Sequence, residues 1–97
     1  MIRYNTYNIC MWKISIHALE RIKERGFSKE EIIFVLNSKF PTTVRLHSPV
    51  DEDVELFMGY CGSKHMLIPV NIKTGYVITV RPMRREERKY YEKRSKE

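Results

Sequence analysis

Three residues that can handle protons or phosphate recur every four positions near the start of the chain. His17, Arg21 and Arg25 would lie on one stripe of a helix, because side chains four residues apart are neighbours on its surface. An imidazole exchanges a proton near neutral pH, and a guanidinium can hold a phosphate through two parallel hydrogen bonds. The stripe therefore carries groups suited to acid–base chemistry beside a phosphate. The alternative, favoured by the charge pattern alone, is an exposed face on which Glu20 and Glu24 neutralise the cations.

A second candidate is Arg81, which follows an alternating apolar segment, residues 76–80, where the chain turns into a basic helix. Because alternate residues of a strand share a face, we expect Val77, Thr79 and Arg81 on one face. A cation at a strand end, beside the free N–H groups of a helix N-terminus, forms an anion site. The alternative is a surface arginine whose stem covers apolar area.

The end of the chain is strongly basic. Residues 81–97 hold 8 of the 18 Lys and Arg side chains but 4 of the 12 Asp and Glu. Such an excess suits nucleic acid or an acidic protein, and it also suits a solvated helix that keeps the protein soluble. Tyr90 could stack on an RNA base or anchor the helix in the core. The cations expected to hold an RNA backbone are Arg25, Arg84, Arg85, Arg88 and Lys89.

The rest of the sequence offers few reactive groups. It contains no Walker loop, GxGxxG, CxxC or HExxH motif. His17, His47 and His65 lie far apart, so we expect neither a metal site nor a cofactor. Cys61 and His65 could form a nucleophile pair across a turn, although an ordinary structural thiol is the favoured interpretation. Lys64 in the same turn is a further candidate for phosphate chemistry.

Length and composition indicate one soluble domain. The 97 residues are 42% hydrophobic and 31% charged, which predicts a single globular domain over 1–97. No apolar run approaches a membrane span or the core of a signal peptide, so we expect a cytoplasmic protein without a membrane partner. Cys10 and Cys61 are expected to be ordinary buried thiols.

Two helices are expected in the first half of the chain. Residues 15–26 place apolar side chains on one face and end at a glycine. Residues 28–39 begin with Ser28 and Glu31, which match a capping box, and Pro41 prevents continuation. The two segments predict a helical hairpin.

The second half changes to an alternating pattern. Strands are expected at residues 42–47, 55–61, 64–72 and 76–80, and a further strand within residues 2–14 is left open. Pro69 indicates an edge position or a bulge. From Met83 the pattern is helical again. The order predicts an α+β fold with two N-terminal helices, a four-stranded, largely antiparallel sheet and a C-terminal basic helix.

Two stretches resemble known families. "VITVRPMRREERKYYE", residues 77–92, resembles the end of the BrnT toxin family, in which an apolar strand leads into an Arg-Pro step and a short basic helix with Glu-Arg. "HALERIKERGFSKEEI", residues 17–32, is similar to a broad prokaryotic family with the pattern His-Ala-x-x-Arg-x-x-x-Arg-Gly before a capped helix. The likeness extends over residues 13–36 and 56–92.

Both families are related to the RelE-like ribonuclease toxins. The resemblance implies a RelE-like fold and a type II toxin that cleaves mRNA, free or on the ribosome, without metal, until a cognate antitoxin protein inhibits it. In that reaction His17 is the candidate base or acid, and Arg81 is the candidate for stabilising the phosphoryl oxygens. Arg21 and Lys64 are further catalytic candidates.

Two other functions stay open. A non-catalytic module of the same fold would bind nucleic acid or an acidic protein through the basic helix. The BrnT pattern has a basic residue near the position of Val54, and its absence here favours this alternative. A purely structural partner protein would not bind RNA even at low salt.

Overall fold

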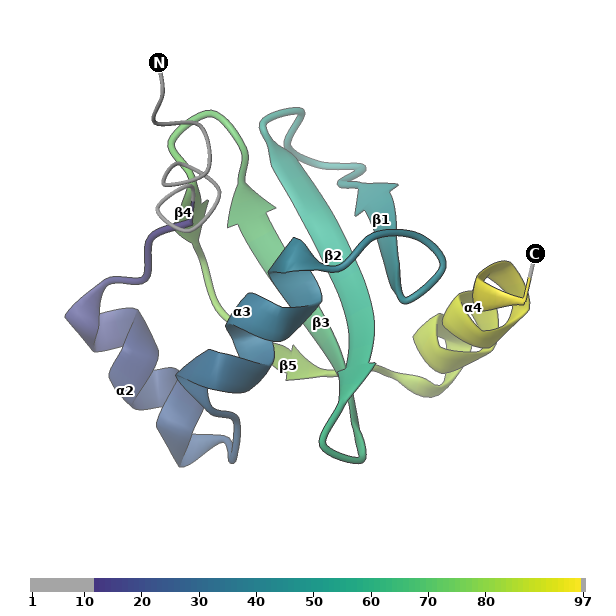
Figure 1. The fold of residues 1–97 in the computed structure, drawn as a ribbon. Helices are drawn as coiled ribbons and strands as arrows, with labels where there is room; N and C mark the ends of the chain where they lie inside the picture. Colours follow the sequence, from purple (N-terminus) through teal and green to yellow (C-terminus); the bar gives the residue numbers. More distant parts are fainter. Residues whose placement is uncertain (1–11, 97) are drawn as a thin grey trace, which may run out of the picture.

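Helices cover both faces of an antiparallel sheet in the computed structural model, which describes residues 12–96 (Figure 1). The elements are α2 (Ile16–Glu24), α3 (Lys29–Asn37), β1 (Thr43–His47), β2 (Val54–Cys61), β3 (Lys64–Asn71), β4 (Tyr76–Val77), β5 (Arg81–Pro82) and α4 (Arg85–Ser95). The predicted α+β class, with two N-terminal helices, an antiparallel sheet and a C-terminal helix, is confirmed.

The two N-terminal helices begin at the serines that the sequence indicated. Ser15 Oγ accepts a hydrogen bond of 3.0 Å from the backbone N–H of Ala18 at the start of α2. At α3, Ser28 Oγ accepts from the N–H of Glu31, and a Glu31 carboxylate oxygen accepts from the N–H of Ser28. This reciprocal pair satisfies two backbone donors that the first turn of a helix leaves open.

The sheet has the order β1-β2-β3, and β4 and β5 both pair with the far edge of β3. β2 and β3 form a hairpin that turns through Gly62 and Ser63, whose φ angles are 60° and 67°. Two successive positive φ angles are characteristic of the type I′ turn, which matches the twist of the flanking strands. The hairpin register then places Tyr60 directly opposite His65 and Cys61 opposite Lys64.

The expected strand over residues 76–80 is interrupted by a bulge. Val77 lies opposite Val70, whereas Arg81 lies opposite Leu67. Three steps along β3 thus correspond to four steps along the last segment, so one residue is extra. The interruption faces Pro69, whose nitrogen has no hydrogen to donate to a neighbouring strand. The prediction that Pro69 marks an edge or a bulge therefore agrees with the register.

The bulge reverses the face on which Arg81 lies. Directly opposed residues share a face, and an extra residue moves everything after it to the other side of the sheet. Val77 belongs to the hydrophobic cluster beneath α2 and α3, whereas Leu67, opposite Arg81, belongs to the cluster beneath α4. The expectation that Val77 and Arg81 share a face is therefore wrong.

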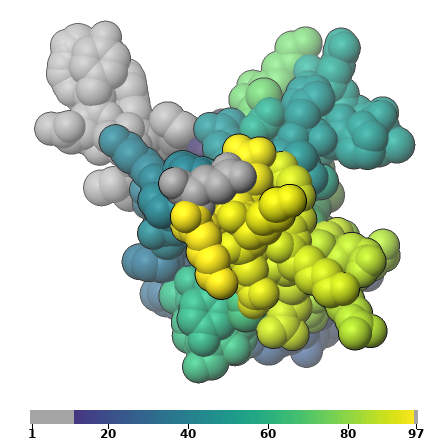
Figure 2. Space-filling view, turned by 90° about the vertical axis from the view of Figure 1, so that its right-hand side faces the viewer, coloured from purple at the N-terminus to yellow at the C-terminus, as the bar shows by residue number. Residues whose placement is uncertain are grey.

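Each face of the sheet has its own hydrophobic cluster. The larger one, between the sheet and the helices α2 and α3, includes Ile22, Phe27, Ile32, Val35, Phe57, Met66, Ile68, Val77 and Val80. The smaller one, between the sheet and α4, consists of Val44, Met58, Leu67, Met83 and Tyr91. α4 is therefore a layer of its own, and Figure 2 shows it in yellow across the outside of the molecule.

The expected N-terminal strand is reduced to one contact within the described residues. Lys13 forms a parallel bridge with Tyr76, and its carbonyl accepts a 2.8 Å hydrogen bond from the N–H of Val77. Cys10 and the rest of residues 1–11 lie outside the described part. Cys61 is a half-buried free thiol beside the larger cluster. None of the helices within residues 12–96 is long and apolar enough to cross a bilayer.

Candidate functional site

The anion site expected beside Arg81 is formed, and a carboxylate of the same chain occupies it. The Nη1 and Nη2 atoms of Arg81 donate to the two carboxylate oxygens of Glu87 at 2.8 and 2.7 Å. Glu87 also accepts a 2.7 Å hydrogen bond from the backbone N–H of Arg84, at the start of α4. Hydrogen bonds from Arg81 hold the pKa of Glu87 below its usual value, and Glu87 raises the pKa of Arg81. Arg81 therefore connects β5 to α4.

The structure does not bring His17 and Arg81 together. Arg81 lies on the α4 face of the sheet, because it is opposite Leu67. His17 is exposed in the first turn of α2, which packs on the other face. An acid–base group on one side of a sheet and a phosphate-binding cation on the other side do not form one catalytic centre.

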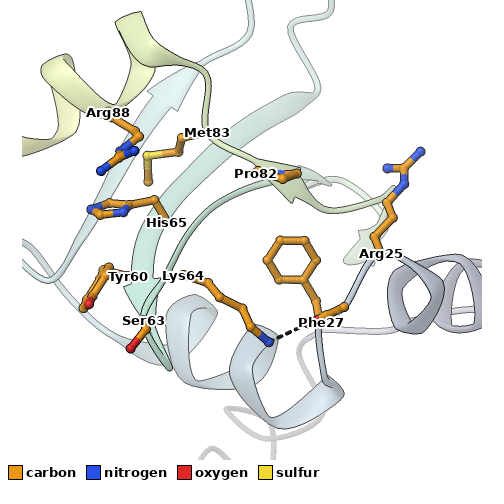
Figure 3. A pocket seen from close by; sticks show the side chains of 10 residues that line it. Arg25, Phe27, Tyr60, Ser63, Lys64, His65, Pro82, Met83 and Arg88 are labelled. Carbon is orange, nitrogen blue, oxygen red and sulfur yellow. Dashed lines mark hydrogen bonds between the residues drawn. The ribbon is translucent and has the colours of Figure 1, made fainter.

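A pocket of about 620 Å³ opens beside the β2–β3 turn. We call it the hairpin pocket, and its lining residues are Arg25, Gly26, Phe27, Tyr60, Ser63, Lys64, His65, Pro82, Met83 and Arg88. Figure 3 shows the side chains of this pocket, which come from the segment after α2, from the β2–β3 hairpin, from β5 and the loop after it, and from α4. Three predicted site residues, Arg25, Lys64 and Arg88, are brought together here although they are distant in sequence.

Two aromatic rings pack around His65 beside the hairpin pocket. The ring centres of His65 and Tyr60 are 4.6 Å apart, and Tyr91 meets the imidazole edge-on at 6.0 Å. The Nε2 atom of His65 lies 3.9 Å from a carboxylate oxygen of Glu92 on α4. The imidazole is thus held in position by two rings while its side chain remains 20% exposed. Arg88, which is labelled with His65 in Figure 3, lines the same pocket.

The three cations of the hairpin pocket differ in how far their charges are compensated. Lys64 Nζ donates to the carbonyl of Gly26 and lies 3.2 Å from the carboxylate oxygens of Glu31. The pKa of Glu31 is below its usual value, first because the backbone N–H of Ser28 donates to it and also because Lys64 is close. Lys64 is therefore largely neutralised.

The other two cations are in no ion pair with a carboxylate within residues 12–96. Arg25 Nη1 donates to the hydroxyl of Thr79 at 3.0 Å and to the carbonyl of Val80 at 2.9 Å, which are neutral acceptors. Arg88 is exposed and belongs to none of the ion pairs among residues 12–96. A guanidinium held by neutral groups is ready to bind an anion, because no carboxylate must first be displaced.

A second pocket, of about 450 Å³, lies along α2. We call it the helix pocket, and its lining residues are Ser15, His17, Ala18, Arg21, Arg25, Tyr76, Val77, Ile78 and Thr79. His17, Arg21 and Arg25 therefore share one face as expected. The alternative, in which Glu20 and Glu24 neutralise this face, is not supported, since none of the ion pairs within the described chain includes these residues.

A third, smaller pocket of about 260 Å³ lies on α4 and is lined by Met83, Arg85, Arg88, Lys89 and Glu92. It shares Met83 and Arg88 with the hairpin pocket, and the hairpin pocket shares Arg25 with the helix pocket. The three pockets thus adjoin one another around the end of the sheet where β5 lies. Most of the predicted cations line this series.

Two predicted RNA contacts lie elsewhere. Arg84 is exposed just before α4, and its backbone N–H binds Glu87. Tyr90 is half-buried against the smaller hydrophobic cluster, and its ring faces the guanidinium of Arg94 at 5.9 Å. The environment of Tyr90 fits the alternative of a core anchor better than base stacking.

The contact between Tyr60 and His65 was not predicted, because His65 was considered only as a metal ligand and as a partner of Cys61. The Gly62-Ser63 turn contained the necessary signal. A two-residue turn pairs the residues next to it, and the following pair, Tyr60 and His65, must then share a face. No group of three His, Cys, Asp or Glu side chains that could hold a metal ion occurs within residues 12–96.

Comparisons with protein-family models, with curated proteins and with solved structures return no match for this chain.

Proposed function

We propose that this protein is an endoribonuclease that binds single-stranded RNA in the hairpin pocket and acts as a toxin of a type II toxin–antitoxin system. The observation that carries the proposal is the meeting of a ring-held imidazole with two uncompensated guanidinium groups, those of Arg25 and Arg88, in one open pocket. An imidazole and preorganised cations are the groups that RNA cleavage by acid–base catalysis requires. The resemblance to BrnT adds the toxin context, with mRNA as substrate and an antitoxin protein as inhibitor.

His65 replaces His17 as the acid–base group in this proposal. The imidazole takes the proton from a ribose 2′-OH, and the 2′ oxygen attacks the adjacent phosphorus. The bond from phosphorus to the 5′ oxygen breaks, and the Tyr60 hydroxyl gives its proton to that leaving oxygen. The products are a 2′,3′-cyclic phosphate and a free 5′-OH, and the imidazolium returns its proton to Tyr60 through water.

The cations stabilise the charge that develops on the phosphate. Arg88 lines the hairpin pocket together with His65 and would bind the non-bridging oxygens. Arg81 becomes a positioning residue, because its bond to Glu87 holds the first turn of α4, and Arg88 is the next residue along that helix. Lys64 connects the wall of the hairpin pocket to α3 through its ion pair with Glu31.

Cleavage of a labelled mRNA by the purified protein tests the proposal. We expect wild type to produce fragments with 2′,3′-cyclic phosphate ends and His65→Ala to produce none. His47→Ala is the matched control, since His47 is an exposed histidine of β1 outside the hairpin pocket. Equal cleavage by wild type and His65→Ala would remove His65 from the mechanism, and intact RNA with wild type, even when ribosomes are added, would refute the nuclease.

A growth assay tests the toxin role. Induced expression of wild type should arrest bacterial growth, His65→Ala should not, and His47→Ala should behave as wild type. Coexpression of a protein from the neighbouring gene should restore growth if it is the antitoxin. Normal growth on induction of the active nuclease would contradict the toxin role while leaving the nuclease intact.

A non-catalytic RNA-binding module is the second candidate. It is favoured because two of the predicted catalytic cations are already paired with carboxylates of the protein: Arg81 with Glu87, and Lys64 with Glu31. This alternative predicts RNA binding that weakens steeply with salt and no cleaved product. The same assay with wild type therefore separates the two functions.

A further inference from the structure

We propose that the helix pocket is a second subsite for the same RNA strand, so that the protein binds an extended single-stranded segment around the end of its sheet. This inference rests on the proposed function and adds the form of the substrate. The two pockets share Arg25, so a strand that leaves the hairpin pocket on the side of α2 enters the helix pocket next. In this arrangement His17 and Arg21 bind backbone and take no part in the reaction.

The cations along α2 are spaced so that they could bind the backbone of an RNA strand. His17 and Arg25 are separated by two helical turns, a length of about 12 Å along the axis. Arg21 lies between them on the same side and, like Arg25, has no carboxylate partner among residues 12–96. Arg25 is held by Thr79 and the carbonyl of Val80 at the boundary of the two pockets. A row of uncompensated cations of this length suits successive phosphates.

The opposite wall offers surfaces for bases. Tyr76 and Ile78 line the helix pocket and are 46% and 48% exposed, which is high for large apolar side chains. Proteins that bind single strands combine a basic groove with aromatic platforms on which bases stack, largely without sequence preference. The helix pocket combines a row of cations with one tyrosine ring, that of Tyr76, which has Lys13 Nζ 5.4 Å from its centroid.

A single strand fits the course of the pockets better than a duplex. The series begins on α4, passes the β2–β3 turn and β5, and ends on α2, which packs on the other face of the sheet (Figure 1). A ligand must therefore bend around the edge of one small domain. A double helix is stiff over such a length, whereas a single strand bends freely.

Binding of 2′-O-methylated oligouridylates tests the second subsite, since the methyl groups block the nucleophile and separate binding from cleavage. Strands of about 4 and about 12 nucleotides lie within the range of about 4–16 nucleotides that one small single-strand-binding domain covers. We expect wild type to bind the longer strand more tightly. Arg21→Ala should reduce this difference in affinity between the two strands. For the longer strand it should also make the plot of log affinity against log salt less steep by about 0.7, the value for one lost phosphate contact.

Lys23→Ala is the matched control, because it removes the same charge from α2 at an exposed position outside both pockets. Lys23→Ala should leave unchanged both the difference in affinity between the longer and the shorter strand and the salt dependence of binding. The inference is overturned if Arg21→Ala and Lys23→Ala bind the longer strand alike, or if a duplex of the same length binds as tightly as the single strand. Failure of the proposed nuclease would appear separately, as intact unmodified RNA.

Discussion

The bond between Arg81 and Glu87 should contribute measurably to folding stability. Glu87→Gln keeps the size of the side chain but removes its charge and weakens two hydrogen bonds of 2.8 and 2.7 Å. A hydrogen bond to a charged group contributes about 1.5–3 kcal/mol. The side chains of Arg81 and Glu87 are 29% and 25% exposed, so solvent screening reduces this value. We expect a loss of about 1–2 kcal/mol, which lowers the Tm of a domain of this size by about 4–16 °C.

The loss should depend on pH. Hydrogen bonds from Arg81 lower the pKa of Glu87 below its usual value of 4.5, so the folded state binds the proton less well than the unfolded state. The stabilisation is therefore complete above pH 4.5 and disappears as the pH falls through the lower pKa of the folded protein. The stability difference between wild type and Glu87→Gln should narrow in acid.

Urea unfolding at neutral and acidic pH measures both effects. Glu86→Gln is the matched control, because Glu86 is an exposed carboxylate in the same first turn of α4, and it should change stability by less than about 0.5 kcal/mol. Equal midpoints for Glu87→Gln and Glu86→Gln at neutral pH would refute the reasoning. A difference that stays constant into acid would show that the carboxylate charge is not the cause.

Three further changes probe the packing that supports the site. Gly59→Ala should destabilise by about 1–3 kcal/mol, because the new Cβ would lie 2.5 Å from a methyl carbon of Val35; an unchanged Tm would mean that α3 can move away from β2. Tyr91→Phe should cost about 0.5–1.5 kcal/mol, since its hydroxyl donates to the carbonyl of Thr42 at 2.7 Å, and a neutral result in thermal unfolding would contradict that bond. Ser28→Ala removes the cap of α3 and should cost about 0.5–2 kcal/mol, whereas an unchanged Tm would argue against this role.

The helices and most strands could be predicted because their signals are local. Ser15 and Ser28 cap the helices with hydrogen bonds to residues three positions away. Alternation along one strand could not predict the face of Arg81. The residue that shifts the alternation is extra only relative to the partner strand β3, so the sequence of residues 76–82 alone does not reveal it. Pro69 indicated that some irregularity was present, but only the register of β3 against β4 and β5 shows where it lies.

The candidate site was only partly predictable for a related reason. The sequence shows which side chains are cationic, but it does not show which charges will be compensated. Lys64 meets Glu31 from 33 positions away, and Arg25 meets Thr79 and Val80 from more than 50. Because of these contacts, Lys64 is paired with a carboxylate, whereas Arg25 is held by neutral acceptors.

A map of RNA contacts on the protein would show directly whether RNA binds in the hairpin pocket. Amide and side-chain NMR signals should be followed while a 2′-O-methylated single strand is added. We expect the largest changes to cluster at the hairpin pocket, at Tyr60, Lys64, His65 and Arg88. Changes confined to the acidic loop of residues 48–53, or spread evenly over both faces, would contradict it.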